Sequence, residues 1–279
     1  MSLDRESLFS LQGRTAVLTG ASGFLGRTFT ETLLSNGARV VALGRSERLE
    51  LETKKWAERF GKDRIRSLRV DMYDLVAFSE RLEEIAAQEE RVDILVNNAH
   101  ELSPKTGFNV SGGSLEEGSY DQWMRNFTGG VYWAALAIKK FGQRMRDAKS
   151  GSIVNISTMY AVVAPSPQLY AGTKFLNPPG YSAAKAALLS FTRYVASFWG
   201  PYGIRANAIL PGPFSNTEDT GLNAVSQDDP FIARLKARTC LGRTGKPHEL
   251  AGALLFLASD ASSYMTGHGL IVDGGWTVT

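Results

Sequence analysis

A tyrosine and a lysine four residues apart are the pair in this chain best suited to chemistry. Tyr181 and Lys185 open a run to Trp199 that lacks glycine and proline and carries apolar residues at three- and four-residue intervals. This pattern is typical of a helix with one buried face. Positions four apart lie on the same side of a helix, so the Lys185 ammonium would lie near the Tyr181 phenol. A nearby cation lowers the pKa of a phenol, which suits proton exchange with an alcohol or ketone oxygen.

The same Tyr-x-x-x-Lys pattern occurs a second time, at Tyr170 and Lys174. A glycine lies inside this copy and the sequence Pro-Pro-Gly follows at 178–180. Because both residue types oppose helix continuation, we predict that Tyr170 is a loop aromatic and that Tyr181 is the proton-transfer group. The alternative for Tyr181 is an exposed tyrosine on an ordinary amphipathic helix, and the motif alone does not decide between the two.

Composition excludes several classes of protein. The chain has 279 residues, 43% of them hydrophobic and 21% charged, with a net charge of only +3. No block of like charge suggests a nucleic-acid partner, and no apolar run approaches the roughly 20 residues of a membrane span. Cys240 is the only cysteine, the amino terminus is polar, and no His, Cys and carboxylate spacing suggests a metal site. We therefore expect a cytoplasmic protein without a metal.

Short β-branched or apolar runs alternate with segments of helical length. The runs are Thr15–Thr19, Ala38–Leu43, Ile65–Asp71, Asp93–Asn97, Ser152–Ser157, Ile204–Leu210 and Gly269–Asp273. This alternation predicts an α/β protein: a single Rossmann domain over 1–279, with a doubly wound, seven-stranded parallel sheet and helices on both faces. Ligands of such sheets bind beyond the carboxyl ends of the strands, where strand order reverses.

The turn after the first predicted strand has the composition of a phosphate-binding loop. Glycines there allow a tight bend and close backbone approach to a phosphate, and the following helix, expected over 27–36, offers free N–H groups. The predicted contacts to a dinucleotide are Gly20, Ser22, Gly23, Phe24, Leu25 and Gly26.

The end of the second strand indicates which dinucleotide binds. No acidic residue stands there to bind both ribose hydroxyls of NAD, whereas Arg45 and Ser46 suit a 2′-phosphate. We therefore predict NADP, with NAD possible; the alternative is a solvent-facing arginine. Asp71, with Met72 beside it, is placed to meet the adenine, and Asn98-Ala99 ends the fourth strand.

Taken together, these motifs resemble those of the short-chain dehydrogenase/reductase family in their order along nearly the whole chain. The resemblance implies that Asn126 holds the water of a proton relay and that Thr158 orients the substrate oxygen. It implies that Tyr181 is the acid/base, and that Lys185 lowers its pKa and binds the nicotinamide ribose. It also implies that Pro211-Gly212 walls the nicotinamide and that the protein is a homo-oligomer, a tetramer or a dimer.

Departures from the family pattern concentrate in loops after strands. The glycine spacing Gly-x-x-Gly-x-x-Gly resembles the extended branch, although the remaining motifs resemble the shorter, classical one. His100 replaces a usual glycine, and the stretches around 100–120 and 159–180 are longer than usual. With 213–240, these form the expected substrate loops. Ser157, His100 and Phe214 are candidate substrate contacts. We do not expect His100 to be catalytic, because Tyr181 already supplies an acid/base and a histidine can be tolerated at a loop start.

The sequence therefore predicts an NAD(P)-dependent oxidoreductase that interconverts a secondary alcohol and a ketone of a small molecule. The insertion before Tyr181 resembles insertions of members associated with sugar and surface-glycan metabolism, which suggests a sugar or sugar-derived substrate. One alternative is a ketone reductase of the acyl-carrier or steroid type. The other is a protein that senses NADP without turnover.

Overall fold

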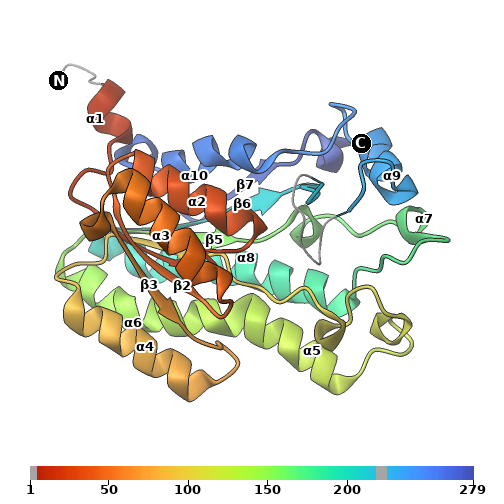
Figure 1. Ribbon diagram of the computed structural model, residues 1–279, viewed down its shortest axis with the longest axis horizontal. Helices are drawn as coiled ribbons and strands as arrows, with labels where there is room; N and C mark the ends of the chain where they lie inside the picture. Colours follow the sequence, from red (N-terminus) through yellow and green to blue (C-terminus); the bar gives the residue numbers. More distant parts are fainter. Residues whose placement is uncertain (1–4, 218–224) are drawn as a thin grey trace.

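The computed structural model describes residues 5–217 and 225–279, and one parallel sheet organises them (Figure 1). Its strand order is β3-β2-β1-β4-β5-β6-β7. The strands are β1 (Thr15–Thr19), β2 (Arg39–Gly44), β3 (Ile65–Arg69), β4 (Ile94–Asn97), β5 (Gly151–Ile156), β6 (Ile204–Pro211) and β7 (Gly269–Val272). The predicted seven-stranded parallel sheet is confirmed.

Strand order reverses between β1 and β4, which are neighbours in the sheet. Thr19, the last residue of β1, is in register with Leu43 of β2 on one side and Asn97 of β4 on the other. The carboxyl ends of these three strands therefore meet at one edge. This edge is the switch point at which doubly wound sheets bind their ligands.

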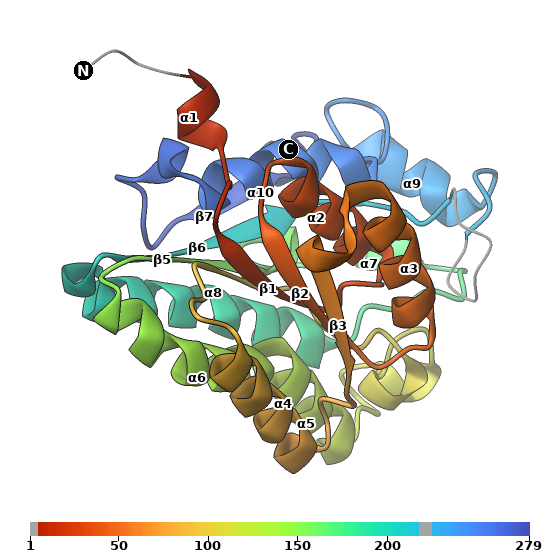
Figure 2. The ribbon, with the colours of Figure 1, turned by 60° about the vertical axis from the view of Figure 1, so that its left-hand side comes forward.

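Helices cover both faces of the sheet (Figure 2). One face packs against α2 (Phe24–Ser35), α3 (Arg48–Phe60) and α10 (Ala251–Ala258), through a core that includes Phe29, Trp56 and Leu254. The other face packs against α4 (Leu75–Gln88), α6 (Trp133–Asp147) and α8 (Pro179–Trp199). Because both faces are covered, strands such as β1 are buried along their whole length, as parallel strands usually are.

Two helices begin earlier than the sequence predicts. The helix carrying Tyr181 starts at Pro179, because proline at the first helical position loses no hydrogen bond and has the right φ. The helix after the glycine turn starts at Phe24 rather than at residue 27. Shorter helices are α1 (Arg5–Phe9), α5 (Tyr120–Phe127), α7 (Pro167–Tyr170) and α9 (Pro230–Arg238). The last lies in the predicted loop 213–240, of which 218–224 fall outside the described residues.

The two long stretches 100–120 and 159–180 contact each other. The Asn109 N–H donates to the Leu176 carbonyl at 3.3 Å, and the Leu176 N–H donates to Asn109 Oδ1 at 3.1 Å. Asn109 adopts a positive φ of 59°, which asparagine tolerates better than most residues. These hydrogen bonds join the two insertions beside the amino terminus of α8.

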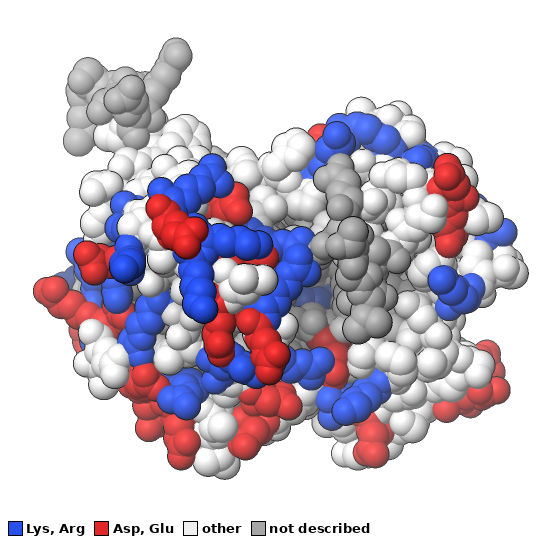
Figure 3. All heavy atoms as spheres, viewed as in Figure 1, with Lys and Arg blue, Asp and Glu red and all other residues white. Residues whose placement is uncertain are grey.

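Positive and negative side chains are interspersed over the face seen in Figure 3, as expected for a chain of low net charge. Within the part of the chain that the structure describes, no helix combines the length and apolarity needed to cross a bilayer.

Candidate active site

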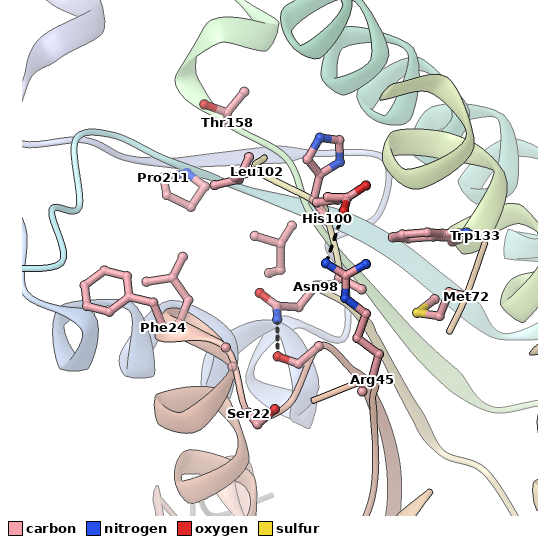
Figure 4. Close-up of a pocket in the computed structure, with 18 of the residues that line it drawn as sticks. Ser22, Phe24, Arg45, Met72, Asn98, His100, Leu102, Trp133, Thr158 and Pro211 are labelled. Carbon is pink, nitrogen blue, oxygen red and sulfur yellow. Dashed lines mark hydrogen bonds and ion pairs between the residues drawn. The ribbon is translucent and has the colours of Figure 1, made fainter. Parts of the chain in front are cut away.

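A cavity of about 410 Å³ opens at the carboxyl ends of the central strands (Figure 4). Every predicted coenzyme residue lines it, and so do Thr158 and the candidate substrate residues Ser157, His100 and Phe214. Asn126 is the one predicted site residue that does not line the cavity. Its side chain is buried in the protein. Among the described residues, no group of three His, Cys, Asp or Glu side chains is arranged to hold a metal ion.

The glycine turn is shaped for close approach of backbone to a ligand. Gly20 has φ +69°, and a Cβ there would lie 2.9 Å from the Ala99 Cα; a Cβ on Gly26 would collide with the Gly20 carbonyl. No side chain caps the start of α2, so the N–H groups of its first turn remain available to an anion. The turn therefore fits the phosphates of a dinucleotide.

Asn98 fastens this turn to β4. Its Nδ2 donates to the carbonyls of Thr19 (3.1 Å) and Gly20 (3.0 Å), while the Thr19 hydroxyl accepts from the backbone N–H groups of Asn98 and Ala99. The side chain of Asn98 thus fixes the two strand ends that form the floor of the cavity.

Tyr181, Thr158 and Lys185 converge at the other end of the cavity. Lys185 is 3% exposed, and its Nζ donates to the Ile156 carbonyl at 2.8 Å while lying 6.0 Å from the centre of the Tyr181 ring. Because Ile156 ends β5, this bond holds α8 against the strand end from which Thr158 follows.

The pKa values of the pair differ from the sequence-based expectation. Burial raises the pKa of Tyr181 to about 12, although a hydrogen bond with the Thr158 hydroxyl acts to lower it. Burial also lowers the pKa of Lys185 to about 7. In the protein without coenzyme, burial dominates the pKa of both groups, and the lowering of the Tyr181 pKa by Lys185 stays a prediction.

Ser157 does not share the role of Thr158. Its Oγ donates to the Lys185 carbonyl at 2.9 Å, so its hydroxyl proton is used within the protein. The Thr158 hydroxyl instead forms a hydrogen bond with the Tyr181 phenol, and its oxygen accepts from the Tyr160 N–H at 3.4 Å. Thr158 is therefore the better placed hydroxyl for a substrate oxygen.

Asn126 is held by the first insertion. Its Nδ2 donates to the Thr106 carbonyl at 2.8 Å and to the Gln122 carbonyl at 2.9 Å, whereas Oδ1 is buried without a partner. A π-helical segment, Thr128–Tyr132, follows α5 directly. Such segments interrupt the regular ladder of backbone hydrogen bonds, which suits the predicted role of holding a water.

His100 lies against Tyr181. Its ring meets Tyr181 edge-on at 5.0 Å, and Phe108 contacts Tyr181 at 5.1 Å. Both ring nitrogens of His100 are buried without a hydrogen-bond partner that meets normal geometry. Burial, and then the positive charge of Lys185, hold the pKa of His100 well below its usual value. The imidazole is therefore neutral at pH 7, and Asn126 and the Gly129 backbone are the hydrogen-bonding groups next to its nitrogens.

The second Tyr-x-x-x-Lys copy is not assembled into a site. Tyr170 is the last residue of α7, so Lys174 lies beyond the helix end. The Tyr170 hydroxyl pairs with the Tyr160 hydroxyl at 3.1 Å, and burial raises the pKa of Tyr170. Tyr170 is a packing residue, at the end of a short helix rather than in the predicted loop.

Arg45 has a partner that the sequence did not reveal. Its Nη2 lies 3.1 Å from Oε1 of Glu101, a buried residue two positions after Ala99. The Ser46 hydroxyl accepts from the Arg48 N–H at 3.1 Å, and Asp71 Oδ1 accepts from the Tyr73 N–H at 3.1 Å. The only sequence signal for Glu101 is its place directly after a strand end at the switch point.

Comparison with known proteins places this site in a family. A model described as "Enoyl-(Acyl carrier protein) reductase" matches residues 20–277. Sorbose reductase of Candida albicans is 32% identical over 97% of this chain and 89% of its own. Galactitol 2-dehydrogenase of Rhizobium johnstonii is 34% identical over 96% and 97%. A crystal structure of a putative NAD(P)-dependent gluconate 5-dehydrogenase from Beutenbergia cavernae, with NADP bound at low occupancy, is 34% identical with a TM-score of 0.82, covering 98% and 100%.

The chain belongs to the short-chain dehydrogenase/reductase family. It is therefore an NAD(P)-dependent oxidoreductase. Membership confirms the family resemblance that the motifs indicate, and the fold of the family accounts for the cavity at the strand ends.

Replacing each tyrosine of the duplicated motif by phenylalanine separates the two copies. We expect Tyr181→Phe to lower kcat at least about 100-fold, because it removes the proton-transfer group, while coenzyme affinity stays nearly unchanged. Tyr170→Phe is the matched control and should keep most of kcat. Steady-state kinetics and coenzyme titration measure both; an inactive Tyr170→Phe with an active Tyr181→Phe would reverse the assignment.

The burial of Lys185 predicts a pH-dependent stability. With its pKa lowered from 10.5 to about 7, the folded protein binds fewer protons than the unfolded chain between these values. The free energy of unfolding should therefore rise with pH in this window, by up to about 1.4 kcal/mol per pH unit. Lys185→Met should lose this rise, as measured by urea unfolding without coenzyme from pH 7 to 9. Parallel pH curves for the two proteins would contradict the buried, weakened cation.

Proposed function

We propose that the protein interconverts a secondary alcohol and a ketone on a sugar, polyol or sugar acid, using NADP. The observation that carries the reaction is the convergence of the Tyr181 and Thr158 hydroxyls on the coenzyme cavity, beside the buried Lys185. The substrate class is supported by the relatives, which are named for sorbose, galactitol and gluconate.

The bound nicotinamide supplies or accepts the hydride, and the protein handles the proton. Thr158 donates a hydrogen bond to the substrate oxygen, and Tyr181 gives that oxygen a proton or takes one from it. Because burial keeps the pKa of Tyr181 near 12, the phenol is protonated at pH 7 and ready to donate to a ketone. Lys185 lies between Tyr181 and the Ile156 carbonyl. We assign its ammonium a hydrogen bond to the ribose of the nicotinamide.

His100 extends this arrangement toward the substrate. Its ring lines the cavity next to Tyr181, and Asn126 and the Gly129 backbone face its nitrogens. We assign the ring a packing contact with the carbon chain of the substrate. Phe214 contributes an apolar side chain to the lining of the same cavity.

A substrate panel followed by nicotinamide absorbance tests the function. Ketoses, polyols and sugar acids are compared with acetoacetyl thioesters, which represent the acyl-carrier alternative named in the family model. We expect the highest kcat/KM on a polyhydroxylated substrate, and none with Tyr181→Phe. A higher kcat/KM on a thioester would favour the alternative, and coenzyme binding without turnover of any substrate would indicate a sensor.

Coenzyme choice is the next expectation. The β2 end offers Arg45 and no carboxylate, and a hydrogen bond to a charged group contributes roughly 1.5–3 kcal/mol. At about 1.4 kcal/mol per tenfold, kcat/KM should favour NADPH over NADH by at least about tenfold. Gly44→Asp with Arg45→Ala should reverse the order; a Cβ on Gly44 meets nothing closer than 3.5 Å, so the fold should tolerate it. Better use of NADH by the wild type would contradict this assignment.

We also propose a cytoplasmic homo-oligomer, a tetramer or a dimer. The single cysteine suits a reducing compartment. Tyr194 and Phe198 of α8 are 56% and 58% exposed and stack at 4.3 Å, which supports burial of this helix face against another copy. Light scattering at micromolar concentration should give a molar mass that is a multiple of 30.4 kDa. The variant Phe198→Glu should have a lower molar mass. A wild-type mass of 30.4 kDa would contradict the assembly.

A further inference from the structure

Glu101 is a buried carboxylate held between two arginines at the coenzyme cavity. Oε1 lies 3.1 Å from Arg45 Nη2, and Oε2 lies 2.8 Å from Arg125 Nη2, while the Glu101 side chain is only 5% exposed. Each carboxylate oxygen therefore has its own cation.

The two arginines are held unequally. Arg125 stacks on the Tyr73 ring at 3.7 Å, and the Tyr73 hydroxyl donates to the Arg125 carbonyl at 3.2 Å. The Arg45 side chain is 55% exposed, against 30% for Arg125. Arg45 can therefore leave while Arg125 keeps the buried carboxylate paired, which avoids the large cost of an unpaired buried charge.

The Arg45–Glu101 pair crosses the coenzyme position. Arg45 follows β2 and Glu101 follows β4, and β1 lies between these strands. The pair thus passes over the end of β1, where the glycine turn begins, and Figure 4 shows the guanidinium extending over the cavity along the dashed ion pair. A 2′-phosphate that binds Arg45 therefore shares this guanidinium with Glu101 or displaces the carboxylate.

We propose that Glu101 sets coenzyme specificity by competing with the 2′-phosphate for Arg45. This inference rests on the proposed role of Arg45 in NADP binding. The carboxylate forms a latch with Arg45 in the free enzyme and reduces the preference for NADPH that Arg45 would otherwise give. It acts on Arg45 and the ribose phosphate, not on the reacting atoms.

The test compares dissociation constants of NADPH and NADH by fluorescence titration. Glu101→Gln should raise the ratio Kd(NADH)/Kd(NADPH) at least about fivefold, because the phosphate then meets no competing charge. Glu101→Asp keeps the charge but moves it away from Arg45, so it should give a smaller rise in the ratio. It provides a second test if Glu101→Gln does not fold. Glu116→Gln removes an exposed charge from the same loop and should leave the ratio unchanged.

An Arg45→Ala background separates this inference from the coenzyme proposal. In that background, Glu101→Gln should change the ratio less than about twofold, because the Arg45 guanidinium for which Glu101 and the phosphate compete is absent. Wild type and Arg45→Ala alone test the coenzyme proposal: equal ratios in these two proteins would reject Arg45 as a phosphate ligand. With Arg45 upheld, an unchanged ratio in both Glu101 variants would overturn the latch. A lower ratio would also overturn it, because Glu101 would then orient Arg45 for the phosphate.

Discussion

The hydrogen bond from Lys185 Nζ to the Ile156 carbonyl is the contact on which the rest of the site depends. With the Ser157 hydroxyl donating back to the Lys185 carbonyl, it locks helix α8 to the end of β5 in one register. That register brings Tyr181, one turn earlier on the helix, to Thr158 just beyond the strand. A rotation of α8 would separate the two hydroxyls and leave a buried ammonium without an acceptor, which is costly.

The two insertions bury Tyr181, because Tyr160 and Tyr170 of the second pack against it as well as aromatic residues of the first. His100 and Phe108 lie edge-on to Tyr181 at 5.0 and 5.1 Å, and Thr106 holds Asn126 behind them. Removing water from around the pair raises the pKa of the phenol and lowers that of the amine. Burial therefore favours the neutral form of both groups, and the Tyr181 phenol is protonated in the free enzyme.

Local patterns of the sequence were sufficient for the sheet and most of the site. Apolar runs located the strands, and Gly172 with the prolines before Tyr181 distinguished the two Tyr-x-x-x-Lys copies, because helix continuity is a local property. Pro179 was misread as a helix breaker because the same residue also starts helices, and its position relative to the helix end decides which.

What the sequence missed depends on contacts between distant segments. The pKa of Tyr181 was expected to fall because spacing reveals Lys185, whereas the burial that raises it comes from Tyr160 and Tyr170 as well as from His100 and Phe108. The Glu101 latch joins loops after β2 and β4, 56 residues apart, and nothing local marks it.

Tracing the transferred hydrogen tests the central claim, that this cavity moves a hydride between coenzyme and substrate while Tyr181 moves the proton. The best ketone of the substrate panel would be reduced with nicotinamide coenzyme deuterated at C4 on one face, then on the other, and the product examined by mass spectrometry and NMR. The account predicts deuterium on the carbinol carbon from one face only, and none on that carbon from heavy water. Deuterium entering the carbinol carbon from solvent, or absent with both labelled coenzymes, would contradict it.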